Sequence, residues 1–250
     1  MNLNNKVAIV TGGSRDIGKA ISLALAAAGA KVVVNYFRNP RHGEETVAEI
    51  EQAGGTAIAV AGDMTVPADV ENLVAKTIEA FGDSIDILVN NVGGLVGRRT
   101  IAEMEQDFFE HVMKLNMTSA FLVTKAVLPH MSSGSSIVNI ASQAARDGGG
   151  QGTSAYAASK GALVSYTRSL AKELGPSNIR VNAVCPGIID TTFHDTFTSD
   201  EARKKFAAAT ALRREGTASE VASLVAYLAS DDASFMAGAN VDINGGIAFS

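Results

Sequence analysis

Lys6-Val7-Ala8-Ile9-Val10-Thr11-Gly12-Gly13-Ser14-Arg15-Asp16-Ile17-Gly18 is the stretch that decides the fold. It opens with a short apolar run rich in β-branched residues, which is typical of a buried strand. The run ends in a glycine pair that predicts a tight turn. From Ile17 onward apolar residues recur at helical spacing until Gly29. A strand, a glycine-rich turn and a helix in this order are the first half of a βαβ unit.

The same alternation recurs along the 250 residues. Strands separated by helices imply a parallel, doubly wound α/β sheet. We expect one domain spanning residues 1–250, without a linker or repeat. The predicted strands are 6–10, 31–36, 56–61, 85–89, 136–141, 179–184 and 240–243, and the predicted helices are 17–28, 43–53, 67–81, 154–174 and 218–229, with a further helical stretch around 101–130.

Composition and charge exclude several classes of protein. A net charge of −5 gives no support for a nucleic-acid partner, which usually leaves a basic footprint. The single cysteine, Cys185, allows no intramolecular disulfide, suits a reducing compartment, and is expected to be buried and inert. The apolar runs are too short or too interrupted for a signal peptide or a membrane span. We therefore expect a cytoplasmic protein with no membrane partner.

Small or polar residues follow five of the predicted strands. In parallel sheets, ligands bind beyond the carboxyl ends of the strands. Turn glycines and caps explain each of these segments singly, but they explain the whole set poorly. The segments are Gly12-Gly13, Asp63, Asn90-Asn91-Val92-Gly93-Gly94, Ser142 and Pro186-Gly187.

Tyr156 and Lys160 lie four residues apart on a predicted helix, and therefore on one face of it. A phenol normally titrates near pH 10, and a neighbouring ammonium lowers that pKa. The pair would then make Tyr156 a usable general acid or base. Because a surface helix also produces such a pair by chance, its interpretation depends on a cofactor site elsewhere in the chain.

The chain resembles the roughly 250-residue branch of the short-chain dehydrogenase/reductase family, including its 3-oxoacyl-ACP reductase-like members. The resemblance covers nearly the whole chain and implies a single seven-stranded Rossmann-type domain. It also implies an oxidoreductase that transfers a hydride between a nicotinamide and a ketone or secondary alcohol, either like the 3-oxoacyl-thioester reductases or like the small-ketone and sugar dehydrogenases. The matching segments are the glycine loop at 11–18, Asn90-Asn91-Val92-Gly93, Ser142, Tyr156 with Lys160, and Pro186-Gly187.

Four catalytic residues follow from this resemblance. Asn116 would hold a water in contact with the lysine, and Ser142 would hydrogen-bond the substrate oxygen. Tyr156 would exchange the proton with that oxygen, while Lys160 would lower the tyrosine pKa and hold the nicotinamide ribose.

The cofactor expected from the resemblance is NADP(H), with NAD(H) possible. No acidic residue lies in 34–38, where NAD-selective members accept from the ribose 2′-hydroxyl. Arg15 and Arg38 are expected to hold a 2′-phosphate instead. Asp63 and Met64 are expected beside the adenine, Asn90 and Gly93 near the adenosine ribose, Ile189 at the carboxamide and Thr191 at the phosphates. The full predicted set is Gly12, Ser14, Arg15, Ile17, Gly18, Arg38, Asp63, Met64, Asn90, Gly93, Tyr156, Lys160, Ile189 and Thr191.

The chain departs from the family pattern at three places. Asp16 replaces the middle glycine of the loop, and Val92 replaces an alanine. The Asp16 carboxylate either faces the pyrophosphate and opposes it, or points away and stabilises the start of the helix through its dipole. We favour the second interpretation. The glycine-rich insert 146–153 makes the gap from Ser142 to Tyr156 one residue longer than in many members, which weakens substrate assignment by analogy.

Two other functions remain open from the sequence. Asp16 allows a protein that binds NAD(P) with little catalysis. A sugar-nucleotide epimerase also uses Tyr-x-x-x-Lys, but it usually has a longer chain and a different glycine spacing.

Several features around the site are also predicted. No metal is expected, because His42, His111, His130 and His194 show no ligand spacing. The polar segment 190–215 is expected to form a mobile lid over a small-molecule substrate. The resemblance also implies a homotetramer that pairs the two longest helices and the last strand.

Overall fold

Seven parallel strands form the centre of the molecule, in the order β3-β2-β1-β4-β5-β6-β7. This computed structural model describes residues 1–249. The order reverses between β1 and β4, so the sheet has a topological switch point next to the glycine loop. The strands are β1 Val7–Val10, β2 Lys31–Tyr36, β3 Thr56–Ala61, β4 Ile87–Asn90, β5 Ser136–Ile140, β6 Arg180–Pro186 and β7 Asn240–Ile243.

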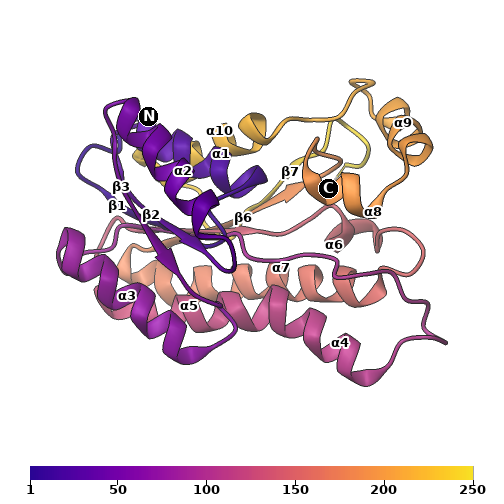
Figure 1. The fold of residues 1–250 in the computed structure, drawn as a ribbon, viewed down its shortest axis with the longest axis horizontal. Helices are drawn as coiled ribbons and strands as arrows, with labels where there is room; N and C mark the ends of the chain where they lie inside the picture. The colour runs from indigo at the N-terminus through magenta and orange to yellow at the C-terminus, as the bar shows by residue number, and fades with distance from the viewer. Residues whose placement is uncertain (250) are drawn as a thin grey trace.

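Helices cover both faces of this sheet (Figure 1). One face carries α1, α2 and α10, and the other carries α3, α4, α5 and α7. Their bounds are α1 Asp16–Ala27, α2 Pro40–Gln52, α3 Pro67–Phe81, α4 Gln106–Met113, α5 Ser119–Val127, α6 Ala144–Asp147, α7 Ser154–Leu174, α8 Thr192–Phe197, α9 Asp200–Ala209 and α10 Ala218–Ala229. A π-helix, Lys114–Thr118, joins α4 to α5, and 3₁₀ turns lie at Leu128–His130, Gly175–Ser177 and Asp231–Ala233.

The inner strands β1, β4, β5 and β6 are mostly apolar because both of their faces are buried. All residues of β1, β4, β5 and β6 are buried. Alternate residues therefore enter two separate cores. Ile21 and Val225 belong to the core between the sheet and α1 and α10, whereas Leu73, Val123 and Leu170 belong to the core beneath α3, α5 and α7.

The predicted α/β class, the Rossmann-type topology and the seven parallel strands are confirmed. Helix α2 begins at Pro40 rather than at residue 43. Proline is favoured at the first helical position, and the Asn39 side chain accepts from the Arg41 N–H at 3.2 Å. The segment 190–215 contains α8 and α9, which its polar sequence did not reveal.

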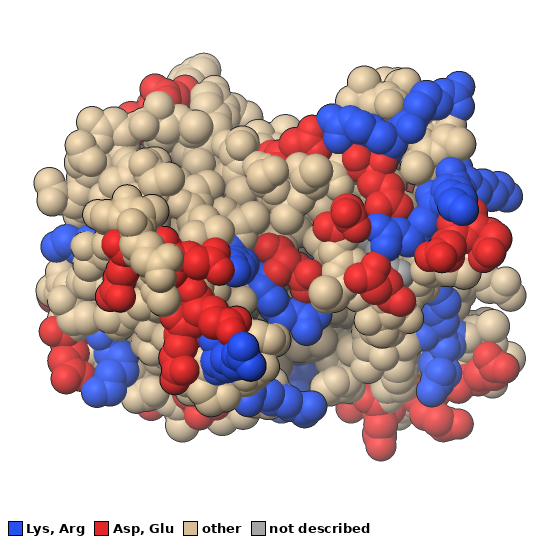
Figure 2. All heavy atoms as spheres, turned by 45° about the horizontal axis from the view of Figure 1, so that its top comes forward, with Lys and Arg blue, Asp and Glu red and all other residues tan. Residues whose placement is uncertain are grey.

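Figure 2 shows acidic and basic side chains mixed on the face that it draws, especially over the part that carries α9. The described part of this face therefore carries no extended patch of one charge. Within residues 1–249, no helix combines the length and apolar character that crossing a bilayer requires.

Candidate active site

A cleft of about 740 Å³ runs along the carboxyl edge of the sheet. This volume falls in the range of sites that enclose a small ligand. Most of the residues predicted from the sequence share its wall. Those that line it are Gly12, Ser14, Arg15, Ile17, Gly18, Arg38, Gly93, Ser142, Tyr156, Lys160, Ile189 and Thr191.

The glycine loop is packed closely on itself at one side of the cleft. Gly12 has a φ of +60°, which favours glycine. A Cβ added at Gly18 would come within 2.0 Å of the Gly12 carbonyl oxygen. The Asn35 side chain accepts from the Gly12 N–H at 3.0 Å, and Asn91 Nδ2 donates to the carbonyls of Thr11 and Gly12. The turn is thus fixed at the start of α1, where a phosphate is favoured.

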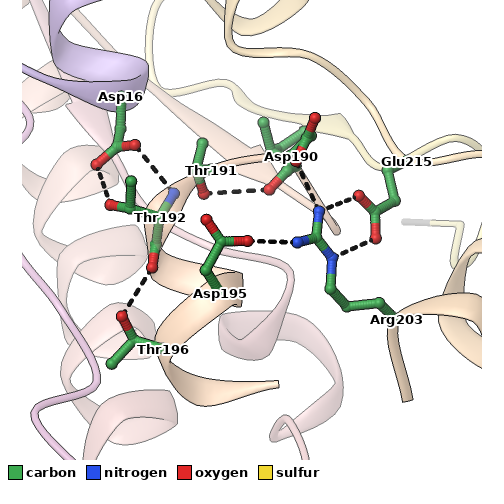
Figure 3. Close-up of polar contacts among 9 residues, drawn as sticks. Asp16, Asp190, Thr191, Thr192, Asp195, Thr196, Arg203 and Glu215 are labelled. Atoms are coloured by element: carbon green, nitrogen blue, oxygen red, sulfur yellow. Dashed lines mark hydrogen bonds and ion pairs between the residues drawn. The ribbon is translucent and has the colours of Figure 1, made fainter. Parts of the chain in front are cut away.

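The Asp16 side chain points to the segment 190–215, which we call the lid. Its carboxylate accepts from the Thr192 N–H at 3.0 Å, from Thr192 Oγ1 at 2.8 Å and from Arg15 Nε at 2.9 Å (Figure 3 draws the two Thr192 contacts). Asp16 is the acidic residue in the first turn of α1 and also lines the cleft, so its stabilisation of the helix dipole stays a prediction. Its main contacts nevertheless lie in the lid segment, which the sequence alone did not indicate.

Arg38 occupies the end of the cleft near β2. Its guanidinium carbon lies 4.9 Å from the centre of the Phe37 ring. Arg15 lines the same cleft, but its Nη2 donates to Thr192 Oγ1 at 3.0 Å. In this structure the Arg15 guanidinium is therefore engaged by the lid.

Three predicted cofactor residues are not among those that line the described cleft. The Met64 side chain is buried in the core with Leu73. Asn90 is buried within the sheet, where its Nδ2 donates to Thr124 and Asn139. Asp63 follows β3 and accepts from the Thr65 N–H at 2.9 Å. Their assignment to the cofactor stays a prediction.

Ser142, Tyr156 and Lys160 line the same cleft as the glycine loop and Arg38. Ser142 follows β5, and its Oγ accepts from the Ala144 N–H at 3.1 Å. Tyr156 and Lys160 come from the first turns of α7. Lys160 Nζ lies 5.9 Å from the Tyr156 ring centre and donates to the Ile140 carbonyl oxygen at 2.7 Å. Two elements thus bring a hydroxyl, a phenol and an ammonium together.

Burial changes the protonation of this pair. It raises the pKa of Tyr156, while the interaction with the Ser142 hydroxyl opposes the rise. Burial lowers the pKa of Lys160 to about 8. The sequence predicted that Lys160 would lower the tyrosine pKa; burial raises that pKa overall, and the part played by Lys160 stays a prediction. Loss of water outweighs the ammonium, which is bonded to a carbonyl rather than to the phenol.

Asn116 lies in the π-helix, a rare element found often at functional sites. It is fully buried, and its Nδ2 donates to the Val112 and Gly94 carbonyls, each at 2.9 Å. Asn116 Oδ1 would lie 2.5 Å and Lys160 Nζ 2.9 Å from a Cβ added at Gly93. The asparagine and the lysine therefore approach the same glycine, although Asn116 itself is not among the cleft-lining residues.

The lid contributes an apolar wall to the substrate side. The Phe193 ring centre lies 6.2 Å from that of Tyr156 and 5.2 Å from that of Phe197. Phe206 and Ile247 also line the cleft. The sequence did not indicate Phe193 and Phe206 as cleft residues, because phenylalanines in a polar segment give no periodic signal.

Gln143 and Asn244 hold the end of the chain beside Ser142. Asn244 Nδ2 donates to Gln143 Oε1 at 2.7 Å and to the Ala248 carbonyl oxygen at 3.0 Å. This places Ile247 in the wall of the cleft. No sequence signal joined these two residues.

The described side chains, which leave out that of His194, contain no group of three histidine, cysteine or acidic residues placed to hold a metal ion. The absence of a metal from the reaction stays a prediction.

The residues fit a dinucleotide. The glycine turn leaves room for close backbone approach, and the Asp16 carboxylate is turned to three donors of its own. The same cleft reaches from Arg38 to Tyr156. The glycine turn and the Tyr156 phenol therefore line one cavity.

Comparison with known proteins agrees with this arrangement. The family profile described as enoyl-(acyl carrier protein) reductase matches residues 12–248. A 3-oxoacyl-[acyl-carrier-protein] reductase of Synechocystis sp. is 39% identical over 249 residues, covering 98% of each chain. A short-chain dehydrogenase of Burkholderia cenocepacia in complex with NADP has a TM-score of 0.91 at 36% identity, covering 99% of each chain. A blue fluorescent protein from a metagenomic library, in complex with NADPH, has a TM-score of 0.92 at 37% identity and covers 100% of each chain.

The match to the family profile spans residues 12–248, the range that contains Gly12, Ser142, Tyr156 and Lys160. The chain belongs to the short-chain dehydrogenase/reductase family and is an oxidoreductase.

Proposed function

We propose that this enzyme is an NADP(H)-dependent carbonyl reductase or alcohol dehydrogenase acting on a small ketone or secondary alcohol. The observation that carries the proposal is the single cleft shared by the glycine turn, Arg38, Ser142, Tyr156 and Lys160. When bound, the nicotinamide cofactor supplies or accepts the hydride.

Ser142 and Tyr156 bind the substrate oxygen and exchange a proton with it. The Ser142 hydroxyl donates a hydrogen bond to it, and Tyr156 Oη delivers the proton in the reduction direction. A high tyrosine pKa keeps the phenol protonated, and therefore able to donate, at neutral pH. Lys160, charged below pH about 8, stabilises the phenolate that remains. Asn116 is the residue that would hold a water near that lysine.

Arg38 supports NADP(H) as the preferred cofactor. It lines the cleft beside β2, where no carboxylate stands to accept from a ribose 2′-hydroxyl. Two of the similar solved structures contain NADP or NADPH. NAD(H) is the alternative that the same assays compare.

The substrate class is an apolar ketone. Phe193 lies against Tyr156, and Leu95, Phe206 and Ile247 line the same cleft. Such a wall favours an aliphatic or aromatic body over a polyol, because apolar surface is removed from water on binding. Whether the 3-oxoacyl thioesters used by the Synechocystis relative are accepted is part of the same test.

Exposed phenylalanines support the proposed homotetramer. Phe109 of α4 and Phe121 of α5 are 40% and 43% exposed on the long helical stretch that packs against α7. Phe249, near the end of the chain, is 90% exposed. Light scattering in solution measures the assembly, and a monomer at micromolar concentration contradicts it. Cytoplasmic residence stays part of the proposal and is tested by fractionation of the source cells.

The experiment is a screen of ketones of graded size and polarity with NADPH and NADH, following absorbance of the reduced cofactor. Parent enzyme is expected to reduce apolar ketones, and the Tyr156→Phe variant to lose about a hundredfold or more in kcat. Full activity in Tyr156→Phe would refute the assigned proton donor. Binding of NADPH without turnover of any ketone or alcohol would favour the catalytically silent protein.

A further inference from the structure

Asp16 adopts an unusual backbone conformation at the start of α1. Its φ is +50°, in the left-handed region. Aspartate tolerates this region better than most residues, but glycine occupies it at no steric cost. A residue kept in a costly conformation at a ligand-binding turn is a reason to look for a role in its side chain.

The Asp16 side chain joins the glycine loop to the lid across a long distance in sequence. The Thr192 N–H and Oγ1 donate to its two carboxylate oxygens at 3.0 and 2.8 Å. Arg15 contacts both residues. Its Nε donates to the Asp16 carboxylate at 2.9 Å, and its Nη2 donates to Thr192 Oγ1 at 3.0 Å. The Asp16 side chain is only 20% exposed, so these charge-assisted bonds are partly shielded from water.

The rest of the lid is tied together as one unit (Figure 3). The Arg203 guanidinium pairs with Asp190, Asp195 and Glu215, which come from both ends of the segment 190–215 and from α8. Arg203 is 16% exposed. One guanidinium on α9 therefore links α8 to both ends of the segment 190–215.

A second contact holds the far end of α8. Arg98 donates from Nε and Nη2 to the Phe197 carbonyl oxygen at 3.4 and 3.3 Å. Between the two anchors, Phe193 contacts the Tyr156 ring. Helix α8 thus crosses the cleft with its first residue bound to the glycine loop and its last to the loop after β4.

We propose that Asp16 is a positioning residue that fastens the lid to the phosphate-binding loop and so limits the release of the dinucleotide. The fastening itself requires only this chain's residues, while the identity of the released ligand rests on the proposed function. Glycine at this position lacks the carboxylate and leaves the Thr192 N–H without this acceptor.

Hydrogen exchange of the protein without cofactor tests the fastening. Peptides covering 190–198 are expected to exchange about three- to tenfold faster in Thr192→Val, which loses the hydroxyl contact, and by at least that factor in Asp16→Gly, which loses the N–H contact as well. Asp16→Asn retains an acceptor for the Thr192 N–H and is expected to lie between the parent and Asp16→Gly. The double variant Asp16→Gly/Thr192→Val is expected to exchange no faster than Asp16→Gly, because Asp16→Gly already removes the contact between the Thr192 hydroxyl and Asp16 that Thr192→Val removes.

Glu79→Gln is the matched control. Glu79 pairs with Lys76 on α3, outside the residues that line the cleft, and this change is expected to leave lid exchange unaltered. Unchanged lid exchange in Asp16→Gly, or additive effects in the double variant, would overturn the proposal. Should Asp16→Gly fail to fold, Thr192→Val carries the same test.

Stopped-flow release of NADPH tests the functional consequence. Both single variants are expected to release NADPH about three- to tenfold faster, with little change in the association rate. Asp16→Gly is expected to keep its affinity within about tenfold of the parent. Faster exchange with unchanged release would refute the link to the cofactor, and a hundredfold gain in affinity would mean that Asp16 opposes the pyrophosphate. If the parent binds no NADPH, the proposed function fails while the exchange result still decides the fastening.

Discussion

Asn116 and Gly94 exchange two hydrogen bonds: the Gly94 N–H donates to Asn116 Oδ1 at 2.9 Å, and Asn116 Nδ2 donates to the Gly94 carbonyl oxygen at 2.9 Å. This pair fixes the loop after β4 against the π-helix. It also fixes Gly93, the position at which a side chain would reach both Asn116 and Lys160.

Gly93→Ala is therefore expected to lower kcat by about tenfold or more, because forcing a methyl group into this space costs about 1–3 kcal/mol and displaces catalytic groups. Steady-state kinetics with a ketone that the parent enzyme reduces measures the loss. Gly94→Ala is the control, since its added Cβ has Leu115 as its nearest neighbour, at 3.9 Å. Equal losses in the two variants would show that the loop, and not the approach to Asn116 and Lys160, matters.

The low pKa of Lys160 predicts a pH-dependent stability. The native lysine releases its proton near pH 8, whereas the unfolded lysine does so near 10.5. The unfolded chain therefore binds more protons between these values, and the burial penalty of the ammonium is relieved as pH rises. From pH 7.5 to 9.5, the parent is expected to gain about 2 kcal/mol in unfolding free energy relative to Lys160→Met.

Urea unfolding at the two pH values checks this gain. Lys172→Met is the control, because Lys172 is exposed on the same helix. A difference between the parent and Lys160→Met that stays constant with pH would contradict the buried, weakly basic lysine.

Arg38 is expected to determine the cofactor preference. Arg38→Ala removes a charge-assisted contact to a 2′-phosphate and should raise the KM for NADPH by about tenfold or more while changing that for NADH little. Arg41→Ala is the matched control, since Arg41 is exposed, pairs with Glu45 and is not among the residues lining the cleft. A parent enzyme with equal kcat/KM for NADH would refute the preference before any variant is made.

Much of this architecture could be predicted from the sequence. The bounds of α3, α7 and α10 match the predicted ranges, because each helix has apolar residues at helical spacing. The glycine turn, Ser142, Tyr156 and Lys160 could be predicted because each belongs to a recognisable local pattern. The parallel topology puts the carboxyl ends of the strands at one edge, so the glycine turn and Ser142 share a cleft with the first turns of α7, the long helix after β5.

Features that depend on distant contacts could not be predicted. The Asp16–Thr192 contact joins residues 176 positions apart, so nothing local indicates it. Helix α9 is a polar element that begins where the Ser199 side chain accepts from the Ala202 N–H, without an apolar stripe to mark it. The direction of the Tyr156 pKa depends on burial, which two residues four apart do not reveal.

The centre of the sheet also has a consequence for synthesis and refolding. Thr11 bonds the Val89 carbonyl oxygen 78 residues away, and its Oγ1 accepts from the N–H groups of Asn91 and Val92. Closing such a distance costs entropy before any pairing repays it, so the chain should fold slowly compared with helical proteins of similar size. A nascent chain in which β4 has not yet been synthesised lacks the contacts that hold the glycine turn in place. Coenzyme added during refolding should therefore stabilise the finished enzyme without helping the early, partly formed states.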